Sequence, residues 1–212
     1  MPSILQRCLC LISIHILTLL SDLSSFSKAE NTATTTSPCC ERDPPKWPSR
    51  FTLVQRLVPS SASKMKPATT VTFYDHDLGA NLIQQTPDNS TEPIFWDLEL
   101  NTQKSYYFYP ETKTCIERDF SVGILRMDWL DGAESIGESM GWNGREVCGW
   151  TKADFLEYYA DKETMEPVSW YFHSMKASFN TIYYQPNVQV PNMEWFTPPE
   201  YCFEDEFSSN EE

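Results

Sequence analysis

Positive charge and histidine are scarce in this sequence. Against 30 Asp and Glu there are only 16 Lys and Arg, so the 212 residues carry a net charge of −14, and there are three histidines. Nucleic acids and anionic membranes share that sign and would be repelled, so we expect no nucleic-acid partner. Hydrophobic residues make up 41% and aromatic residues 14%, which is too much for a disordered chain. The length suits one globular domain with tails.

Long apolar runs are absent after the amino terminus. Residues 8–20 are apolar, follow Arg7, and precede the small-residue site Ser27-Lys28-Ala29. This arrangement is typical of a signal peptide, which we predict over residues 1–29, with a retained anchor as the alternative. We predict no membrane span in the mature chain. We expect a secreted, extracellular or cell-wall protein, and the endomembrane lumen is the alternative compartment.

The mature chain also lacks C-x-x-C pairs, which argues against a zinc ribbon or a thioredoxin-type site. Five cysteines remain after the leader: Cys39, Cys40, Cys115, Cys148 and Cys202. An oxidising compartment favours disulfides among them. An odd number leaves one thiol over, and because adjacent cysteines rarely bond to each other, Cys39 or Cys40 is the natural spare.

Histidines that could form a catalytic triad or a metal site are few in this sequence. Outside the leader only His76 and His173 could serve a triad or a metal, and they lie far apart in the sequence, so we read them as ordinary polar residues. We therefore expect no metal centre and no cofactor. The acidic surface indicates solvation first and weak calcium binding second. The sequon Asn89-Ser90-Thr91 lies in a turn-like stretch and predicts N-glycosylation at Asn89.

From Phe51 onward, runs of β-branched and aromatic residues alternate with turn residues, which predicts antiparallel strands. We expect strands near 51–58, 68–75, 81–85, 94–100, 104–109, 114–120, 145–150, 155–160, 168–173 and 179–185. A short helical turn is expected at 128–133 and a glycine-rich loop at 137–144. Residues 30–46 read as an extended linker, 47–203 as the β domain, and 204–212 as an acidic disordered tail. A curved sheet, a barrel and a sandwich all fit this pattern.

Paired carboxylates are the candidates for catalysis, because glycoside chemistry needs two acids at a defined separation. One group is Asp128, Asp131 and Glu134 around Trp129, which could stack on a sugar. The other is Asp97 and Glu99, which share a face if 94–100 is a strand. With so many acids, chance pairs are expected, and a cap and a turn account for the first group equally well.

Aromatic residues are the candidates for ligand binding. On alternating strands some of them must face a concave side, where an uncovered surface would form an apolar pocket. The candidates are Tyr106, Phe108, Tyr158, Trp170, Phe172 and Tyr183. An ordinary aromatic core is the alternative for each of them.

A long motif lies at residues 121–133, S-V-G-I-L-R-M-D-W-L-D-G-A, and a second at 158–170. With the closing Tyr201-Cys202-Phe203 they resemble an uncharacterised family of secreted plant proteins over roughly residues 47–203. Some members of that family carry a glycosyl-transfer label.

Three further segments are similar to ependymin-related proteins: residues 40–50 with C-x-x-x-P-P-x-W-x-x-R, residues 112–115, and residues 196–202 with F-T-P-P-x-x-C. The resemblance implies a secreted, disulfide-bonded glycoprotein with a curved antiparallel sheet or half-barrel, like that of lipoprotein carriers, cupping a hydrophobic pocket. It implies a Cys115–Cys202 bridge and suggests Cys40–Cys148, with Cys39 unpaired.

Together these patterns predict a mainly β protein that binds a hydrophobic, lipid-like or glycan ligand in the concave face of its sheet. A carbohydrate-active enzyme that works by glycosyl transfer or hydrolysis is the first alternative. A structural or adhesive extracellular protein is the second.

Overall fold

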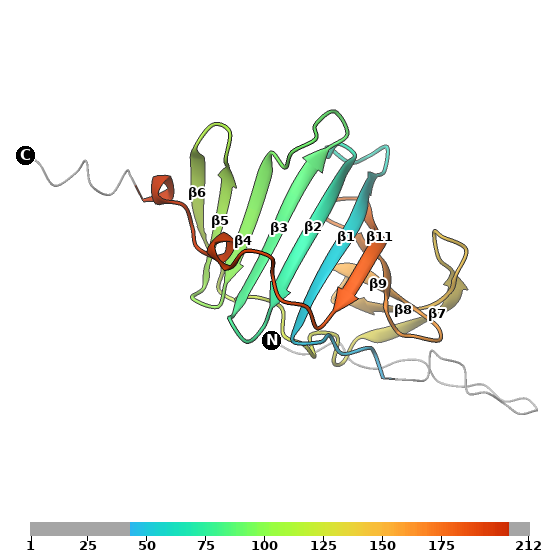
Figure 1. Ribbon diagram of the computed structural model, residues 1–212. Coiled ribbons are helices and arrows are strands. Elements are labelled where there is room, and N and C mark those ends of the chain that lie inside the picture. The colour runs from blue at the N-terminus through green and yellow to red at the C-terminus, as the bar shows by residue number, and fades with distance from the viewer. Residues whose placement is uncertain (1–42, 204–212) are drawn as a thin grey trace, which may run out of the picture. The chain divides into compact units, whose positions relative to one another are not determined.

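The computed structural model describes residues 43–203, which form one curved antiparallel sheet (Figure 1). The strands are β1 Arg50–Pro59, β2 Ala68–Asp75, β3 Ala80–Pro87, β4 Phe95–Leu100, β5 Lys104–Tyr109, β6 Thr114–Asp119, β7 Glu134–Met140, β8 Glu146–Lys152, β9 Leu156–Asp161, β10 Pro167–Phe172 and β11 Ala177–Pro186. Two short 3-10 helices follow, η2 Met193–Phe196 and η3 Glu200–Cys202. The expected mainly β fold with an open, curved sheet and little helix is confirmed.

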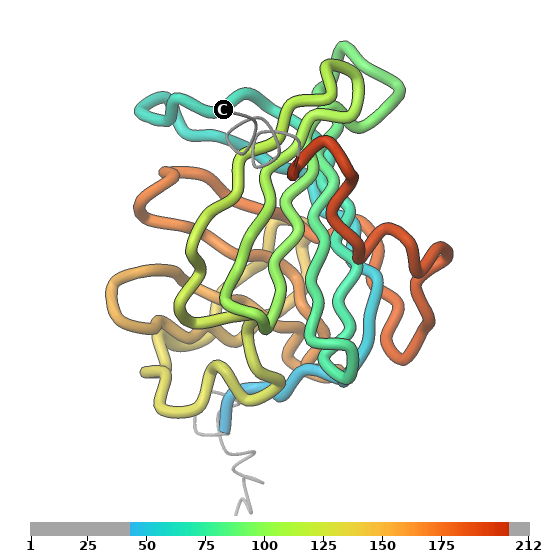
Figure 2. Tube along the Cα trace, turned by 90° about the vertical axis from the view of Figure 1, so that its left-hand side faces the viewer, coloured from blue at the N-terminus to red at the C-terminus, as the bar shows by residue number. Residues whose placement is uncertain are grey.

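The sheet consists of two meanders that meet in the middle. Its order is β6-β5-β4-β3-β2-β1-β11-β10-β9-β8-β7, so β1 pairs with β11 and the outer edges are β6 and β7. A flat sheet of eleven strands would separate those edges by about 48 Å. The connection from β6 to β7, residues 120–133, is full of turns and cannot reach that far. The sheet therefore bends until its two halves face each other (Figure 2).

The first half of the glycine-rich stretch is strand, which corrects the expected loop for 137–140, while residues 141–144 form the turn between β7 and β8. Residues 134–140 form β7, and Gly137 lies opposite Gly149 of β8, next to an irregularity in the pairing. Gly137 has φ +95°, which favours glycine, and a Cβ at Gly149 would lie 2.7 Å from the Ile136 side chain. Here glycines permit a bulge and a close approach inside a strand pair. The expected helical turn at 128–133 is a run of hydrogen-bonded turns instead.

The outer face of β2–β6 is closed by the carboxyl-terminal segment. Leu82, Leu98 and Tyr106 are successive cross-strand partners, so their side chains share this face. They form a buried cluster with Phe73, Phe108 and Val190, and Trp195 and Tyr201 pack against it. Figure 1 shows the segment running across these strands.

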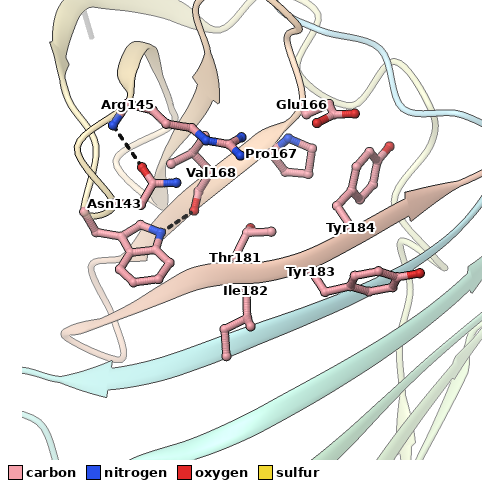
Figure 3. Close-up of a pocket in the computed structure, with 10 residues that line it drawn as sticks. Asn143, Arg145, Glu166, Pro167, Val168, Thr181, Ile182, Tyr183 and Tyr184 are labelled. Carbon is pink, nitrogen blue, oxygen red and sulfur yellow. Dashed lines mark hydrogen bonds between the residues drawn. The ribbon is translucent and has the colours of Figure 1, made fainter.

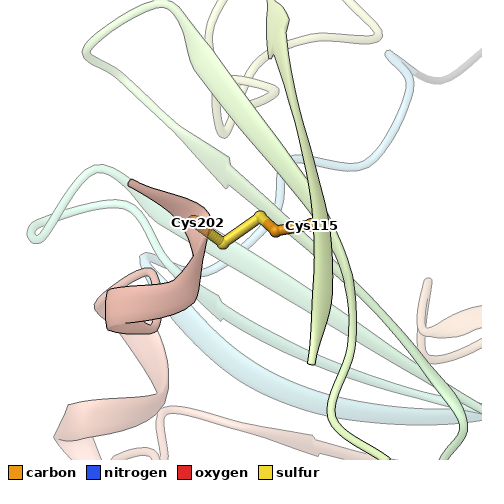
Figure 4. Close-up of a disulfide and its surroundings, with 2 residues drawn as sticks. All are labelled: Cys115 and Cys202. Carbon is orange, nitrogen blue, oxygen red and sulfur yellow. A yellow bond between two sulfur atoms is a disulfide. The ribbon is translucent and has the colours of Figure 1, made fainter. Parts of the chain in front are cut away.

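A disulfide fixes the end of this segment. Cys115 on β6 and Cys202 on η3 are bonded, which ties the last helical turn to the sheet edge (Figure 4). This is the pair that the ependymin resemblance implies. Cys148 is also disulfide-bonded. Its implied partner Cys40, together with Cys39, the leader, most of the linker and the acidic tail, lies outside the described residues.

The inner face of the β8–β11 half holds a second cluster, built around Trp47. The indole of Trp47 is in edge contact with Phe51 and Tyr74 and is stacked on Trp170, with ring centroids 5.1–5.5 Å apart. Trp150 and Tyr158 are fully buried in the same cluster. Such aromatic contacts bury large apolar areas and fix the two halves of the sheet against each other.

Candidate functional site

The connection between the sheet edges, which we call the strap (residues 120–133), lies over the inner face. Its backbone N–H at Ile124 donates to Asn101 Oδ1 over 3.2 Å. The Tyr74 hydroxyl donates to the Leu125 carbonyl over 2.6 Å, and Trp47 N–H donates to the Met127 carbonyl over 2.8 Å. Most of the long motif at residues 121–133 therefore lies over the concave side of the sheet.

Gly79 and Gly123 allow the strap to come close. Both have positive φ, +69° and +64°, and a Cβ on either would lie within 3 Å of the Asn101 side chain. Asn101 lies in the β4–β5 turn, directly after β4. Its amide side chain contacts Gly79 in the β2–β3 turn and Gly123 in the strap, so it holds these three segments together.

A hollow of about 360 Å³ remains between the strap and the sheet, and we call it the inner hollow. Its β2–β5 wall is Thr72, Tyr74, Asn81, Ile83, Asp97, Glu99 and Tyr107; facing it are Trp47, Phe120, Leu125, Phe155, Trp170, Phe172 and Met175. One wall is thus mixed in polarity and the other is almost wholly apolar.

Two carboxyl groups point into the inner hollow from β4. Asp97 and Glu99 flank Leu98, which points to the outer face, so the alternation predicted for residues 94–100 is present. Ser105 Oγ donates to Asp97 Oδ1 over 3.0 Å, and Asn81 Nδ2 donates to Glu99 Oε2 over 2.7 Å. Among residues 43–203, no lysine, arginine or histidine forms an ion pair with either carboxylate.

This setting keeps a proton on the pair at unusually high pH. Burial, and after it the charge of Glu99, raises the pKa of Asp97 to about 7. Burial also raises the pKa of Glu99, although the Asn81 hydrogen bond opposes the shift. The pKa of Tyr107, which is the cross-strand partner of Asp97, is raised by burial and then by both carboxylates. The two carboxyl groups therefore influence each other's titration, and both pKa values lie above those of free carboxyl groups.

Two further polar atoms of the inner hollow have no hydrogen-bond partner within the described part of the chain. They are Asn81 Oδ1, beside Glu99, and Trp170 Nε1 on the opposite wall. Buried polar atoms without partners cost stability, and in native proteins they usually find water or a ligand. Their residues line the inner hollow, while the two atoms themselves are buried behind its surface.

The predicted ligand-binding aromatics are divided among three places. Trp170 and Phe172 line the inner hollow, and Tyr158 is buried in the core beneath it. Tyr106 and Phe108 lie on the closed outer face against the carboxyl-terminal segment, so they cannot touch a ligand in the hollow. The residue between them, Tyr107, faces the hollow instead.

Tyr183, the last of these aromatics, is 48% exposed and lines a separate outer groove of about 390 Å³ near Trp142, Arg145 and Glu166 (Figure 3). Trp142 Nε1 donates to the Val168 carbonyl over 3.2 Å. This groove is open to solvent and mixes rings with charges. The inner hollow is less open than this groove and mostly apolar, so we take it as the candidate site.

The acids proposed around Trp129 do not line one common hollow, and only Asp128 lines a groove, of about 410 Å³ beside His76 and Arg126. Asp128 pairs with Arg126 at 2.8 Å, while the side chains of Asp131 and Glu134 are exposed. None of the three lines the inner hollow. Trp129 itself packs edge-on against Trp47 and Tyr158, which removes it as a stacking platform.

Sequence reasoning passed over two short motifs. Gly137–Gly141 reads G-E-S-M-G, but Ser139 lies in the edge strand β7 and not at the strand-to-helix turn that a nucleophile elbow needs. Asp75-His76-Asp77 reads D-x-D in the β2–β3 turn. Arg50 pairs with both of its carboxylates, at 3.2 and 2.8 Å, so a structural ion pair occupies them.

Asn89 and His173, two other residues singled out in the sequence, lie at the surface. Asn89 is exposed in the turn between β3 and β4, where a glycan would fit. His173 pairs with Glu157 at 3.5 Å near the surface. Within the described residues, no group of three or more potential ligands could hold a metal ion. The same part of the chain contains no helix with the length and apolarity needed to cross a membrane.

Comparison with known proteins gives a family and distant structural likenesses. None of the curated proteins matches the chain in sequence. An uncharacterized conserved protein from Thermus thermophilus is similar in structure, with 10% identity, a TM-score of 0.48, and coverage of 73% of this chain and 87% of that one. A putative outer membrane lipoprotein-sorting protein domain from Vibrio parahaemolyticus has 10% identity, a TM-score of 0.33, and coverage of 72% and 91%.

The family match spans nearly all of the described structure. The model of a domain of unknown function, DUF8395, matches residues 46–202, from just before Trp47 to the disulfide at Cys202. It thus includes both meanders, the strap and the carboxyl-terminal segment. The chain belongs to the DUF8395 family.

Proposed function

We propose that this protein binds a small hydrophobic molecule in the inner hollow. The observation that carries the proposal is the hollow itself, about 360 Å³ between the strap and the concave face of the sheet, with Leu125, Phe155 and Met175 exposed on its open side. Protein interiors are normally packed without such voids, because an unfilled apolar space loses contacts on every side. Volumes of this size are typical of sites for small organic ligands.

The walls support the same proposal. Phe172, Trp170 and Leu125 present apolar surface, while polar groups gather on the β3–β4 side. A few placed polar groups in an apolar enclosure orient a ligand, whereas the apolar area supplies most of its affinity. A lipid-like molecule with one polar end matches this division.

A second candidate is glycoside transfer or hydrolysis by Asp97 and Glu99. Residues two apart on a strand point to the same face, so the two carboxyl groups are neighbours, as a pair of acids in glycoside chemistry must be. A raised pKa on one acid also fits a general acid. Incubation with a panel of aryl glycosides and with activated sugar donors tests this candidate. Turnover that is lost in Asp97→Asn would support it.

The decisive test of ligand binding is native mass spectrometry of protein purified from its source, searching for a co-purifying small molecule. Ile83→Trp fills the inner hollow from β3 and should release that molecule, while Val58→Trp adds the same ring at an exposed position and should retain it. A protein that emerges empty, and whose melting temperature is unchanged by lipid extracts, would contradict the proposal.

We also propose that the chain is exported and glycosylated. The Cys115–Cys202 disulfide supports an oxidising compartment, and the exposed turn at Asn89 supports access for a glycan. Glycosidase treatment should lower the mass of the secreted protein, and Asn89→Gln should abolish that shift. A mature chain that begins at Met1 and carries no glycan would contradict export.

A further inference from the structure

We infer that the ligand of the inner hollow is an organic cation, an apolar molecule that carries an amine or quaternary ammonium group held by Asp97 and Glu99. This inference rests on the proposed function and adds the chemical class of the ligand. Two observations carry it. Two carboxyl groups point into the inner hollow, and no cationic side chain among residues 43–203 is paired with either of them.

No positive group in the described part of the protein neutralises the pair. The hydrogen-bond partners of the carboxylates are neutral, Ser105 for Asp97 and Asn81 for Glu99. The strap and β10 face the pair with Phe120, Leu125 and uncharged aromatic residues. A buried carboxylate without a compensating charge is costly, so this arrangement is expected where a cation arrives with the ligand.

The nearest arginine does not change this conclusion. Arg118 on β6 pairs across the sheet with Ser105, and Ser105 in turn pairs with Glu99, so Arg118 shares the inner face. Its side chain is exposed at the sheet edge, and it makes no ion pair with either acid. The other ionisable neighbours are Tyr74 and Tyr107, which are neutral at physiological pH because burial raises both of their pKa values.

Aromatic rings complete the setting for a cation. Tyr107 lies opposite Asp97, and Tyr74 lies opposite Asn81, in cross-strand pairs whose Cβ atoms are about 5 Å apart. Trp47 and Trp170 form part of the facing wall. The faces of such rings attract an ammonium group, most strongly where water is excluded.

The same features disfavour anionic lipids. A fatty-acid carboxylate or a phosphate head placed here would meet two acids and no cation, and like charges in a low-dielectric site repel strongly. The inner hollow therefore selects by the charge of the head group as well as by apolar area.

The experiment compares three ligands with the same tail: decyltrimethylammonium, decanol and decanesulfonate. Binding is followed by calorimetry and by tryptophan fluorescence at about pH 8, above the raised pKa of Asp97, and again at about pH 5. We expect the cation to bind at least about tenfold more tightly than decanol at the higher pH, and the sulfonate to bind more weakly than either. The advantage of the cation should shrink at the lower pH, because the pair takes up protons.

The variant D97N/E99Q should reduce the advantage of the cation over decanol to about twofold, with the affinity for each ligand measured in that variant. The control E111Q/E163Q removes two exposed charges elsewhere and should keep the full advantage, which separates the site from the general acidity of the protein. Equal binding of cation and sulfonate, or an advantage that survives in D97N/E99Q, would overturn the inference alone. Failure of all three ligands to bind would instead count against the proposed hollow.

Discussion

The two faces of β4 and β5 are built from alternate residues of the same hairpin, yet one face is closed and the other is open. Leu98, Tyr106 and Phe108 point outward into a cluster sealed by the carboxyl-terminal segment. Asp97, Glu99 and Tyr107 point inward to a hollow. The difference teaches that the covering element, rather than the strand, decides which alternate residues become core and which become site.

The largest effect is expected from releasing the cover of the outer face. Replacing Cys115 and Cys202 with serine removes a crosslink between residues separated by 87 positions. Loop entropy predicts a loss of about 4 kcal/mol in the free energy of unfolding. Chemical denaturation under non-reducing conditions measures it. A loss below about 1 kcal/mol would show that packing alone holds the segment in place.

A matched pair of truncations compares the faces directly. Leu98→Ala opens a cavity in the sealed cluster and should cost about 3 kcal/mol, whereas Ile83→Ala enlarges an existing hollow and should cost about 1 kcal/mol. Urea unfolding of both variants gives the ratio. Equal losses would mean that the inner hollow is closed and packed in solution.

The pH dependence of stability isolates the polar side of the hollow. Because the pKa of Asp97 is raised in the folded state, the folded protein binds a proton there more tightly than the unfolded chain does. This contribution therefore lowers stability as pH rises from about 4 to about 7, by roughly 4 kcal/mol, and is constant above that range. Asp97→Asn should flatten this slope in thermal unfolding measured across the range. If the dependence of stability on pH is unchanged in this variant, groups other than Asp97 cause it.

The smallest effect is expected outside both faces. Asp128→Asn breaks an exposed ion pair with Arg126 and should change stability by less than about 0.5 kcal/mol. It should also leave ligand binding in the inner hollow unchanged. A loss of turnover or binding in this variant would restore the acids around Trp129 as candidates.

The strands were predictable because their period of two is local. Alternation and turn residues located ten of the eleven strands, and alternation placed Asp97 and Glu99 on one face. β7 was missed because Gly137, Gly141 and Gly144 suggested a loop. In the structure the glycine at position 137 serves a bulge, which depends on the neighbouring strand.

The choice of face could not be predicted from the same pattern. Residues 106–109 are four consecutive aromatic residues, so both faces of this strand look apolar. The sequence pattern therefore does not show which of these residues face the inner side of the sheet. Tyr107 faces the hollow only because residues 187–203 return to cover Tyr106 and Phe108. That return is a long-range contact, and only the Cys115–Cys202 pairing implied by the ependymin resemblance pointed toward it.

The pairing of β1 with β11 also governs how the protein is made. The first strand to leave the ribosome has its second neighbour more than one hundred residues away, from Arg50–Pro59 to Ala177–Pro186. Contacts of such high sequence separation slow folding, since a long loop must close before they form. Until β11 is synthesised, the inner edge of β1 stays unpaired and prone to aggregation. Nascent chains truncated before residue 177 should therefore depend on chaperones, and the inner hollow should form only after the chain is released.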